Sequence, residues 1–275
     1  MNRLISKVRR AALELLPSRP VPIMVAGEAY HIDSQTPLRS PLDDYDYAWL
    51  RELAKRKRSI LDAGSSVGLT ALMFARHMDP SGTCVLFDGS KVALKRAAAN
   101  LLAAGPPAPS IFLCYSWVGA DTDSASPVPG LIPCAAPITT INAELDGLSK
   151  TPPPLSLDGI CRRHDLRPDL VKVDVEGAEH DALAGAAWLA EVIRPIFQVE
   201  LHTFNLEMEE AASRVIEWCR QWEYEPWYLK RHERLTDPAQ LSERRRCHVL
   251  LLPAGAPYPE ELRPISQGTS AIHAV

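Results

Sequence analysis

The chain has 275 residues, a formal net charge of −4 and 23% charged residues, a composition typical of a globular protein long enough to bury a core. Basic residues form no extended face, so we expect no nucleic acid as partner, and no apolar run approaches the roughly 18 residues of a membrane helix. The six cysteines include no Cys-x-x-Cys pair, which favours reduced thiols and a cytoplasmic location over a disulfide framework or a zinc site.

Residues 1–58 are expected to form an N-terminal extension that packs on the core. Apolar side chains recur at helical intervals over residues 1–16, opposite a basic face, and three prolines follow. We expect this helix to pack on the core or on a second copy of the chain, in a homodimer, rather than on a membrane. Residues 21–42 favour short strands and turns, and Asp43 or Asp44 is expected to cap a second helix.

A strand, a tight turn and a helix are predicted around residues 59–68, which read Ser-Ile-Leu-Asp-Ala-Gly-Ser-Ser-Val-Gly. Glycine lets the backbone approach a ligand closely, and the N-terminus of the following helix offers unpaired N–H groups. We therefore expect this segment to bind a nucleotide-like cofactor. The residues assigned to that task are Asp62, Gly64, Ser65, Ser66 and Gly68.

The spacing of the glycines separates the cofactors that such a loop could bind. A dinucleotide fingerprint needs Gly-x-Gly-x-x-Gly, and Ser66 stands where the second glycine would admit a pyrophosphate. A nicotinamide oxidoreductase is therefore the least favoured interpretation. An acidic residue two positions before the first glycine, with Gly-x-x-x-Gly after it, resembles the S-adenosylmethionine loop of class I methyltransferases.

The next predicted strand, over residues 83–87, ends in further polar residues. Asp88 follows about 20 residues after the glycines, where a carboxylate can accept both ribose hydroxyls of a nucleotide. Gly89 and Ser90 come next and open a helix expected over residues 91–104. We assign all three to the cofactor site, with an ordinary Asp-Gly turn as the structural alternative.

A third strand is expected over residues 110–115, and Trp117 and Val118 at its carboxyl end are assigned to the cofactor site. The indole could cover an adenine ring, and core packing is the alternative. Residues 120–154 are rich in proline and lose periodicity, which predicts a lid-like insertion that shapes the substrate entrance, with a short edge strand at residues 138–141.

Acidic residues and one histidine gather where the fourth and fifth predicted strands end. Asp174 and Glu176 follow a strand expected at residues 169–173, and Glu200 and His202 close the next strand. The carboxyl ends of parallel strands meet at one edge of an open sheet, so these side chains should border the same crevice as the glycine loop.

The stretch from about residue 59 to residue 202 resembles the FkbM-type methyltransferase family. The resemblance rests on Asp-Leu-Val-Lys-Val-Asp-Val-Glu-Gly-Ala-Glu at residues 169–179, preceded by Leu-Asp-Gly-Ile at 157–160 and followed by Val-Glu-Leu-His at 199–202. Two departures retain small polar or acidic character, and cofactor binding is therefore expected to survive them. The family's usual Gly-Ala-Asn loop reads Gly-Ser-Ser here, and its usual Glu-Pro after the second strand reads Asp-Gly.

The resemblance implies the class I methyltransferase fold, a Rossmann-like, doubly wound α/β domain over residues 59–253 with a mostly parallel seven-stranded sheet. It also implies S-adenosylmethionine as cofactor, S-adenosylhomocysteine as product, and a hydroxyl group of a sugar or small natural product as methyl acceptor. The tail over residues 254–275 is expected to be loosely held.

Methyl transfer to a hydroxyl group needs an aligned acceptor oxygen and a group that takes its proton. The candidates for the second task are Asp174, Glu176, Glu200 and His202. We favour His202, whose ordinary pKa suits a general base near neutral pH, together with Asp174, which ends the strand that usually faces the methyl group in this fold. No metal ligand is assigned, although clustered carboxylates holding a magnesium ion stay open as an alternative.

Two other functions stay open. The methyl acceptor could be a carboxylate or an amide nitrogen of a peptide-like metabolite, and a carboxylate would need no strong base. The chain could also be a catalytically silent, cofactor-binding partner subunit that uses its basic N-terminal helix as the interaction surface.

Overall fold

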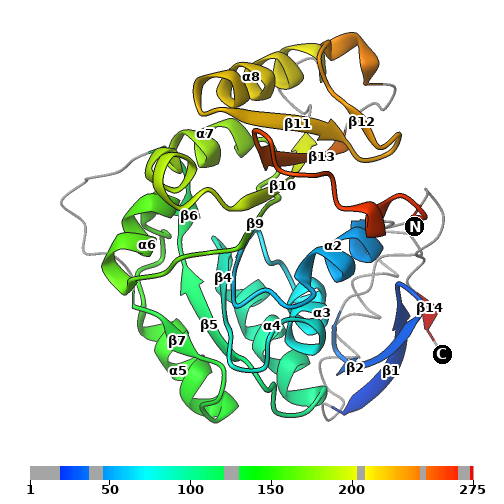
Figure 1. Ribbon diagram of the computed structural model, residues 1–275. Coiled ribbons are helices and arrows are strands. Elements are labelled where there is room, and N and C mark those ends of the chain that lie inside the picture. Colours follow the sequence, from blue (N-terminus) through cyan, green and yellow to red (C-terminus); the bar gives the residue numbers. More distant parts are fainter. Residues whose placement is uncertain are drawn as a thin grey trace, which may run out of the picture.

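The structure is a computed structural model, and a mixed β-sheet with helices on both faces forms its centre (Figure 1). The predicted helix over residues 1–16 and its proposed homodimer contact lie outside the described residues, as does the predicted cap at Asp43 or Asp44. The residues that the structure describes are 19–36, 46–120, 130–202, 208–241, 246–265 and 273–274.

The central sheet confirms the predicted doubly wound topology. In spatial order its strands are β12 (Glu233–Arg234), β11 (Tyr224–Tyr228), β13 (Arg246–Pro253), β10 (Ile196–His202), β9 (Leu170–Val173), β3 (Ser59–Ala63), β4 (Thr83–Asp88), β5 (Ser110–Tyr115) and β7 (Ile132–Pro133). Among the seven strands from β11 to β5, β13 alone runs against the others. The two-residue strands β12 and β7 extend the predicted seven-stranded sheet at its edges.

Helices cover both faces of this sheet (Figure 1). One face carries α2 (Asp46–Ala54), α3 (Leu69–His77), α4 (Lys91–Ala103) and α5 (Ile138–Gly147). The other carries α6 (Leu157–His164), α7 (Glu179–Ala184), a π-helical turn (Leu189–Ile193) and α8 (Met208–Gln221). Successive residues of a strand face opposite sides, so Ile60 joins the first hydrophobic cluster and Leu61 the second. None of the helices in the described residues is long and apolar enough to cross a membrane.

The N-terminal extension contributes α2 and two strands of a small antiparallel sheet beside α4, lower right in Figure 1, and the third strand of that sheet comes from the C-terminal tail. Its strands are β14 (His273–Ala274), β1 (Pro20–Val25) and β2 (Glu28–Asp33). The short strands predicted over residues 21–42 are thereby confirmed as far as that segment is described. Tyr30 and Ile32 are buried in the same hydrophobic cluster as α3 and α4.

The segment predicted as a lid-like insertion is only partly described, from residue 130 onward. The predicted edge strand at 138–141 is wrong, because α5 occupies it. Ile141 and Leu145 are both buried at helical spacing, and Pro137 precedes the helix as its cap, where its fixed φ is tolerated. The edge strand is β7 instead, paired with β5.

The expectation of a loosely held tail is wrong for its described part. Tyr258 and Leu262, the latter in a 3₁₀ turn (Glu260–Leu262), are buried in the hydrophobic core, as is Ile265. His232 contacts two of these residues. Its Nδ1 atom is 2.6 Å from the hydroxyl of Tyr258, and its Nε2 atom is 2.9 Å from the carbonyl oxygen of Ile265. The prolines and glycines of this segment suggested a loose tail, so its three buried apolar side chains were not predicted.

Three further short elements complete the described chain. Strands β6 (Trp117–Val118) and β8 (Pro154–Leu155) pair in parallel, and a 3₁₀ turn covers Pro238–Gln240. The β6–β8 pair places Trp117 beside the carboxyl ends of the central strands, next to β4.

Candidate active site

The loop between β3 and α3 has the conformation that its glycines predict. Gly64, Ser66 and Gly68 have φ values of 81°, 49° and 77°, in the left-handed region that glycine favours. A Cβ atom at Gly64 would lie 1.6 Å from the carbonyl oxygen of Asp174, and one at Gly68 would lie 2.8 Å from the Cβ atom of Ala97. The loop can therefore settle between β9 and α4 only with glycine at both positions.

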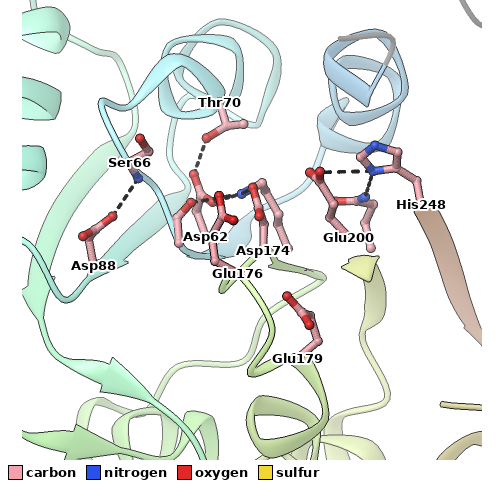
Figure 2. Close-up of polar contacts among 12 residues, drawn as sticks. Asp62, Ser66, Thr70, Asp88, Asp174, Glu176, Glu179, Glu200 and His248 are labelled. Carbon is pink, nitrogen blue, oxygen red and sulfur yellow. Dashed lines mark hydrogen bonds and ion pairs between the residues drawn. The ribbon is translucent and has the colours of Figure 1, made fainter. Parts of the chain in front are cut away.

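The carboxylate of Asp88 ties this loop to the end of β4. The backbone N–H of Ser66 donates to its Oδ2 atom at 2.9 Å, a contact drawn in Figure 2, and that of Ser90 donates to Oδ1 at 2.7 Å. Burial raises the pKa of Asp88, against the effect of these two bonds. The carboxylate borders the cavity described next, so it can also meet a ligand there.

A cavity of about 290 Å³ opens at the carboxyl ends of the strands, where open α/β sheets bind their ligands. Trp117 forms one wall, with 59% of its surface exposed and its ring 3.1 Å from where a Cβ of Gly89 would lie. Core packing of this tryptophan is thereby excluded. The cavity is lined by Gly64, Ser66, Phe87, Asp88, Gly89, Ser116, Trp117, Val118, Asp174, Val175, Glu176 and Ala178; the described part of the 120–154 segment adds none.

A smaller cavity of about 70 Å³ shares Gly64, Ser66 and Asp174 with the larger one. Its other walls come from Ser65, the first turn of α3, Lys172 and Tyr47 of α2. The hydroxyl of Ser65 is buried and has no hydrogen-bond partner among the described residues, so it is available to a ligand in this space. The two cavities therefore border the same loop.

Three predicted cofactor residues lie outside both linings, and each supports the loop instead. Asp62 is fully buried and accepts a hydrogen bond from the hydroxyl of Thr70 (Figure 2). Gly68 packs on α4, as described above. The hydroxyl of Ser90 accepts the backbone N–H of Ala93 at 3.2 Å and so caps α4.

Lys172 is a buried cation at the centre of the site. Its Nζ atom lies 3.1 Å from Oδ1 of Asp62 and 3.2 Å from Oδ2 of Asp174, and it donates to the carbonyl oxygen of Gly64 at 3.2 Å. Burial favours the neutral amine, but the nearby carboxylates outweigh it and raise the pKa of Lys172. The lysine therefore stays charged and fixes the position of both aspartates.

His202 lies among four carboxylates. Its Nδ1 atom is 2.9 Å from Oε1 of Glu179, and its Nε2 atom is 3.5 Å from Glu200, 3.8 Å from Glu176 and 3.9 Å from Asp174. Burial alone would lower the pKa of His202, but hydrogen bonds with Glu179 and Glu200 and the charges of these groups raise it to about 10. The side chain should therefore be an imidazolium at neutral pH, which argues against the prediction that His202 is the favoured general base.

Asp174 and Glu176 line the larger cavity, whereas Glu200 and His202 lie behind them. Burial raises the pKa of Asp174, and the positive charge of Lys172 opposes that effect. Glu176 has a φ of 54°, and its side chain is 72% exposed. Of the four predicted catalytic residues, Asp174 combines partial burial, a fixed orientation and access to the cavity.

Asp174, Glu200 and His202 each offer one atom within 4.8 Å of the others, which is compatible with a metal ion. Binding one would require His202 to lose its proton, because metals bind the neutral imidazole. Lys172 and the imidazolium already oppose these carboxylates with positive charge. These positive charges weaken the attraction of the carboxylates for a cation from solution.

Sequence reasoning missed several residues of the site, among them Lys172, Glu179 in its bond to His202, Ser116 and Tyr47. The lysine had a readable signal, since a charge inside the apolar run Leu-Val-Lys-Val is rarely buried without a partner. Ser116 directly follows β5, next to the strand that ends in Asp88, and this position also marks the crevice. Tyr47 carried no signal, because only the packing of α2 on α3 brings it to the loop.

Comparison with known proteins identifies one matching family. The profile of the methyltransferase FkbM domain matches residues 62–226. No curated protein matches the chain.

Three solved structures illustrate the resemblance of the fold. The FkbM methyltransferase of Methylobacillus flagellatus KT is 14% identical, with a TM-score of 0.46 over 72% of this chain, and the chain spans 44% of that protein's length. The O-methyltransferase TomG of Streptomyces achromogenes, solved with S-adenosylmethionine, is 13% identical, with a TM-score of 0.42 over 77% of this chain and 79% of its own. A SAM-dependent O-methyltransferase of Thermotoga maritima is 11% identical, with a TM-score of 0.46 over 90% of this chain and 98% of its own.

Proposed function

The chain belongs to the FkbM methyltransferase family, and from this premise we propose that it transfers a methyl group from S-adenosylmethionine to a hydroxyl group of a small natural product or sugar. The observation that carries the proposal is the carboxylate of Asp174, which lines the cofactor cavity and is held by Lys172 at 3.2 Å. A fixed carboxylate at this point can take the proton of an acceptor hydroxyl.

The residues of the two cavities fit the cofactor. Asp88 lies where it can accept hydrogen bonds from ribose hydroxyls, and Trp117 presents an exposed ring face to a purine. Ser65, Tyr47 and the loop backbone line the smaller cavity, where we place the amino-acid end of the molecule. When bound, S-adenosylmethionine supplies a methyl group already activated by its sulfonium.

The chain's own residues orient the acceptor and remove its proton. Asp174 accepts that proton, and burial has raised its pKa toward the working pH, which improves it as a base. Lys172 holds one oxygen of this carboxylate, which leaves the other free to turn toward the acceptor. The imidazolium of His202, 3.9 Å from Oδ1, offsets the negative charge that the four carboxylates bring together.

The electrostatics of the site separate the alternative acceptors. A carboxylate acceptor would enter beside Asp174 and Glu176, with Glu179 and Glu200 close behind, and like charges at such distances repel. A hydroxyl or an amide meets no such repulsion, and the presence of a placed base favours the hydroxyl. A silent partner subunit would have no use for an anchored carboxylate on the cavity wall, so we rank that function last.

The first experiment measures binding of S-adenosylmethionine and S-adenosylhomocysteine by calorimetry, with Trp117→Ala and Asp88→Ala as variants. The indole ring of Trp117 is exposed, and the one hydrogen bond described for this residue comes from its backbone N–H, which alanine retains, so removal of the ring should weaken binding about tenfold without unfolding the chain. Asp88→Ala should weaken binding further, because it also releases the N–H of Ser66. Absence of binding by the wild-type chain would refute the proposal.

The second experiment tests the acceptor with a panel of sugars, phenols, polyketide alcohols, carboxylic acids and peptide amides, following S-adenosylhomocysteine release. We expect turnover with hydroxyl compounds and none with carboxylic acids. Turnover restricted to carboxylic acids would contradict the electrostatic argument and favour the alternative.

We also propose a small-molecule partner, a cytoplasmic location and a homodimer contact through the N-terminal extension. All six cysteines are buried and unpaired, which supports a reducing compartment. Sedimentation of the chain with and without residues 1–18 tests the dimer.

A further inference from the structure

Asn100 is a fully buried amide in a helix face made otherwise of apolar residues. It lies in α4, where Leu94, Ala97 and Leu101 are also buried. Burying an amide costs free energy unless its hydrogen bonds are made, and Asn100 makes three. The burial of this amide is therefore compensated by a specific set of hydrogen-bond partners.

These partners come from two separate parts of the chain. The Nδ2 atom of Asn100 donates to the carbonyl oxygen of Val67, in the cofactor loop, at 2.7 Å. Its Oδ1 atom accepts the backbone N–H of Asp33 at 2.9 Å and the hydroxyl of Thr36 at 2.6 Å, both in the N-terminal extension. Because one end of the amide faces two donors and the other an acceptor, its orientation is fixed.

On the loop side, Asn100 binds Val67, which lies between two residues in the left-handed backbone conformation. Ser66 and Gly68, with φ values of 49° and 77°, flank Val67. Asp88 fixes the N–H of Ser66 and Asn100 fixes the carbonyl of Val67, so the strained turn is held at two successive residues. Such a backbone persists only where its surroundings determine it fully.

On the extension side, the end of β2 is clamped to the same helix. Arg96, one turn before Asn100, donates to Oδ1 of Asp33 at 2.9 Å, and the N–H of Gln35 donates to the same carboxylate at 2.8 Å. Farther along the chain, Tyr47 of α2 lines the smaller cavity. The extension therefore reaches the cofactor loop from two directions.

We propose that Asn100 is a positioning residue that couples the cofactor loop to the N-terminal extension. Binding of S-adenosylmethionine at the loop stabilises the end of β2 through this side chain, and the docked extension in turn raises the affinity of the loop for the cofactor. The two effects are equal, because a coupling free energy between two sites is reciprocal. The inference rests on the cofactor site of the proposed function and not on the identity of the acceptor.

The test uses Asn100→Asp, Thr36→Val and Gln221→Glu in the full chain. Asn100→Asp keeps an oxygen for the donors of the extension but loses the donor to Val67 and places a carboxylate against its carbonyl. We expect S-adenosylhomocysteine to bind it about tenfold more weakly or worse, since a buried hydrogen bond is replaced by an unpaired acceptor. Thr36→Val should weaken binding a few fold. Gln221→Glu makes the same amide-to-carboxylate change at an exposed position on α8 and, as the matched control, should bind as the wild type does.

Hydrogen exchange supplies a readout that a general loss of stability would not produce. In the wild-type chain, S-adenosylhomocysteine should slow exchange at residues 28–36, and this response should disappear in Asn100→Asp while the control retains it. Should Asn100→Asp not fold, Thr36→Val carries the test, because it leaves the bond to Val67 in place and should still reduce the response at residues 28–36.

Unchanged affinity for S-adenosylhomocysteine in a folded Asn100→Asp variant would overturn the coupling. The coupling would also be overturned if the ligand did not change hydrogen exchange at residues 28–36 of the wild-type chain. Both results presuppose that the wild-type chain binds the ligand. A wild-type chain that binds neither S-adenosylmethionine nor S-adenosylhomocysteine would instead overturn the proposed function, and the coupling with it.

Discussion

The Oε1 atom of Glu179 lies 2.9 Å from Nδ1 of His202 and accepts the backbone N–H of Gly177 at 2.8 Å. One carboxylate oxygen thus joins the end of β10 to the turn after β9, in which Glu176 and Gly177 both have positive φ. The contact holds that turn and keeps the histidine protonated. Glu179 is therefore a positioning residue, and the general base has to be sought elsewhere in the cluster.

The charge of His202 should appear in the stability of the chain. Its pKa of about 10 lies above the ordinary value of 6.5, so the imidazolium stabilises the fold fully below pH 6.5 and loses that effect as the pH rises through 10. Since one pKa unit corresponds to about 1.4 kcal/mol, the free energy of unfolding should fall by a few kcal/mol across this window. Urea unfolding of the wild type and of His202→Gln at several pH values measures it; equal slopes for the two chains would contradict the prediction.

Asp174→Asn should abolish most of the methyltransferase activity and leave the affinity for the cofactor unchanged. Loss of a general base lowers kcat by about 10²–10⁴, whereas the amide keeps the shape of the cavity wall. Glu176→Gln is the matched control. Because the side chain of Glu176 is exposed, this substitution should lower kcat by less than about tenfold. The residual activity of Asp174→Asn should also lack the rising limb that a general base gives to the pH profile of kcat; a limb that persists in this variant would restore His202 as the base.

Removal of divalent metals should leave the activity unchanged. The carboxylates of Asp174 and Glu200 already face the cations of Lys172 and His202, and we expect EDTA-treated enzyme to turn over at the original rate. If EDTA abolishes turnover and Mg²⁺ restores it, the cluster of Asp174, Glu200 and His202 holds a metal in the active enzyme.

The sequence signals that predicted the fold correctly were residues whose position allows few structural alternatives. Gly64 and Gly68 marked the loop, because only glycine fits against β9 and α4, and Asp88 marked the end of β4. Long apolar runs placed the buried strands within one or two residues of their observed bounds, since such runs have few other uses.

The parts that sequence could not predict depend on several elements packed together. The ordinary pKa of histidine suggested a base, but the four carboxylates that favour the protonated form of His202 come from two segments of the chain, residues 174–179 and the end of β10. Asn100 and Tyr47 reach the cofactor loop only because α4 and α2 pack beside it. Prolines near α5 and in the tail suggested irregular chain, although Ile141 and Leu262 are buried anchors.

Gly64→Ala should unfold the cofactor loop. Its Cβ would lie 1.6 Å from the carbonyl oxygen of Asp174, and the residue has a positive φ, so the backbone of β3 or β9 must move. We expect loss of cofactor binding and a destabilisation of about 3 kcal/mol or more, in the range of severe single substitutions. Gly119→Ala, which meets no atom within 4 Å, is the matched control and should change the stability by less than about 0.5 kcal/mol. Normal cofactor affinity in Gly64→Ala would show that the loop can shift.

Lys172→Met should destabilise the chain more than any other substitution of a charged residue in the site. It leaves Asp62, which is fully buried, and Asp174 without their shared cation, and removing one partner of a buried ion pair costs about 3–5 kcal/mol. The double variant Lys172→Met/Asp62→Asn should recover part of that loss, because the buried charge goes with its partner while Thr70 can still bond the amide oxygen. Urea unfolding of the two single variants and the double variant measures the coupling between the residues. Additive losses would mean that Lys172 and Asp62 do not interact in the folded chain, and the central position of the lysine in the site would have to be abandoned.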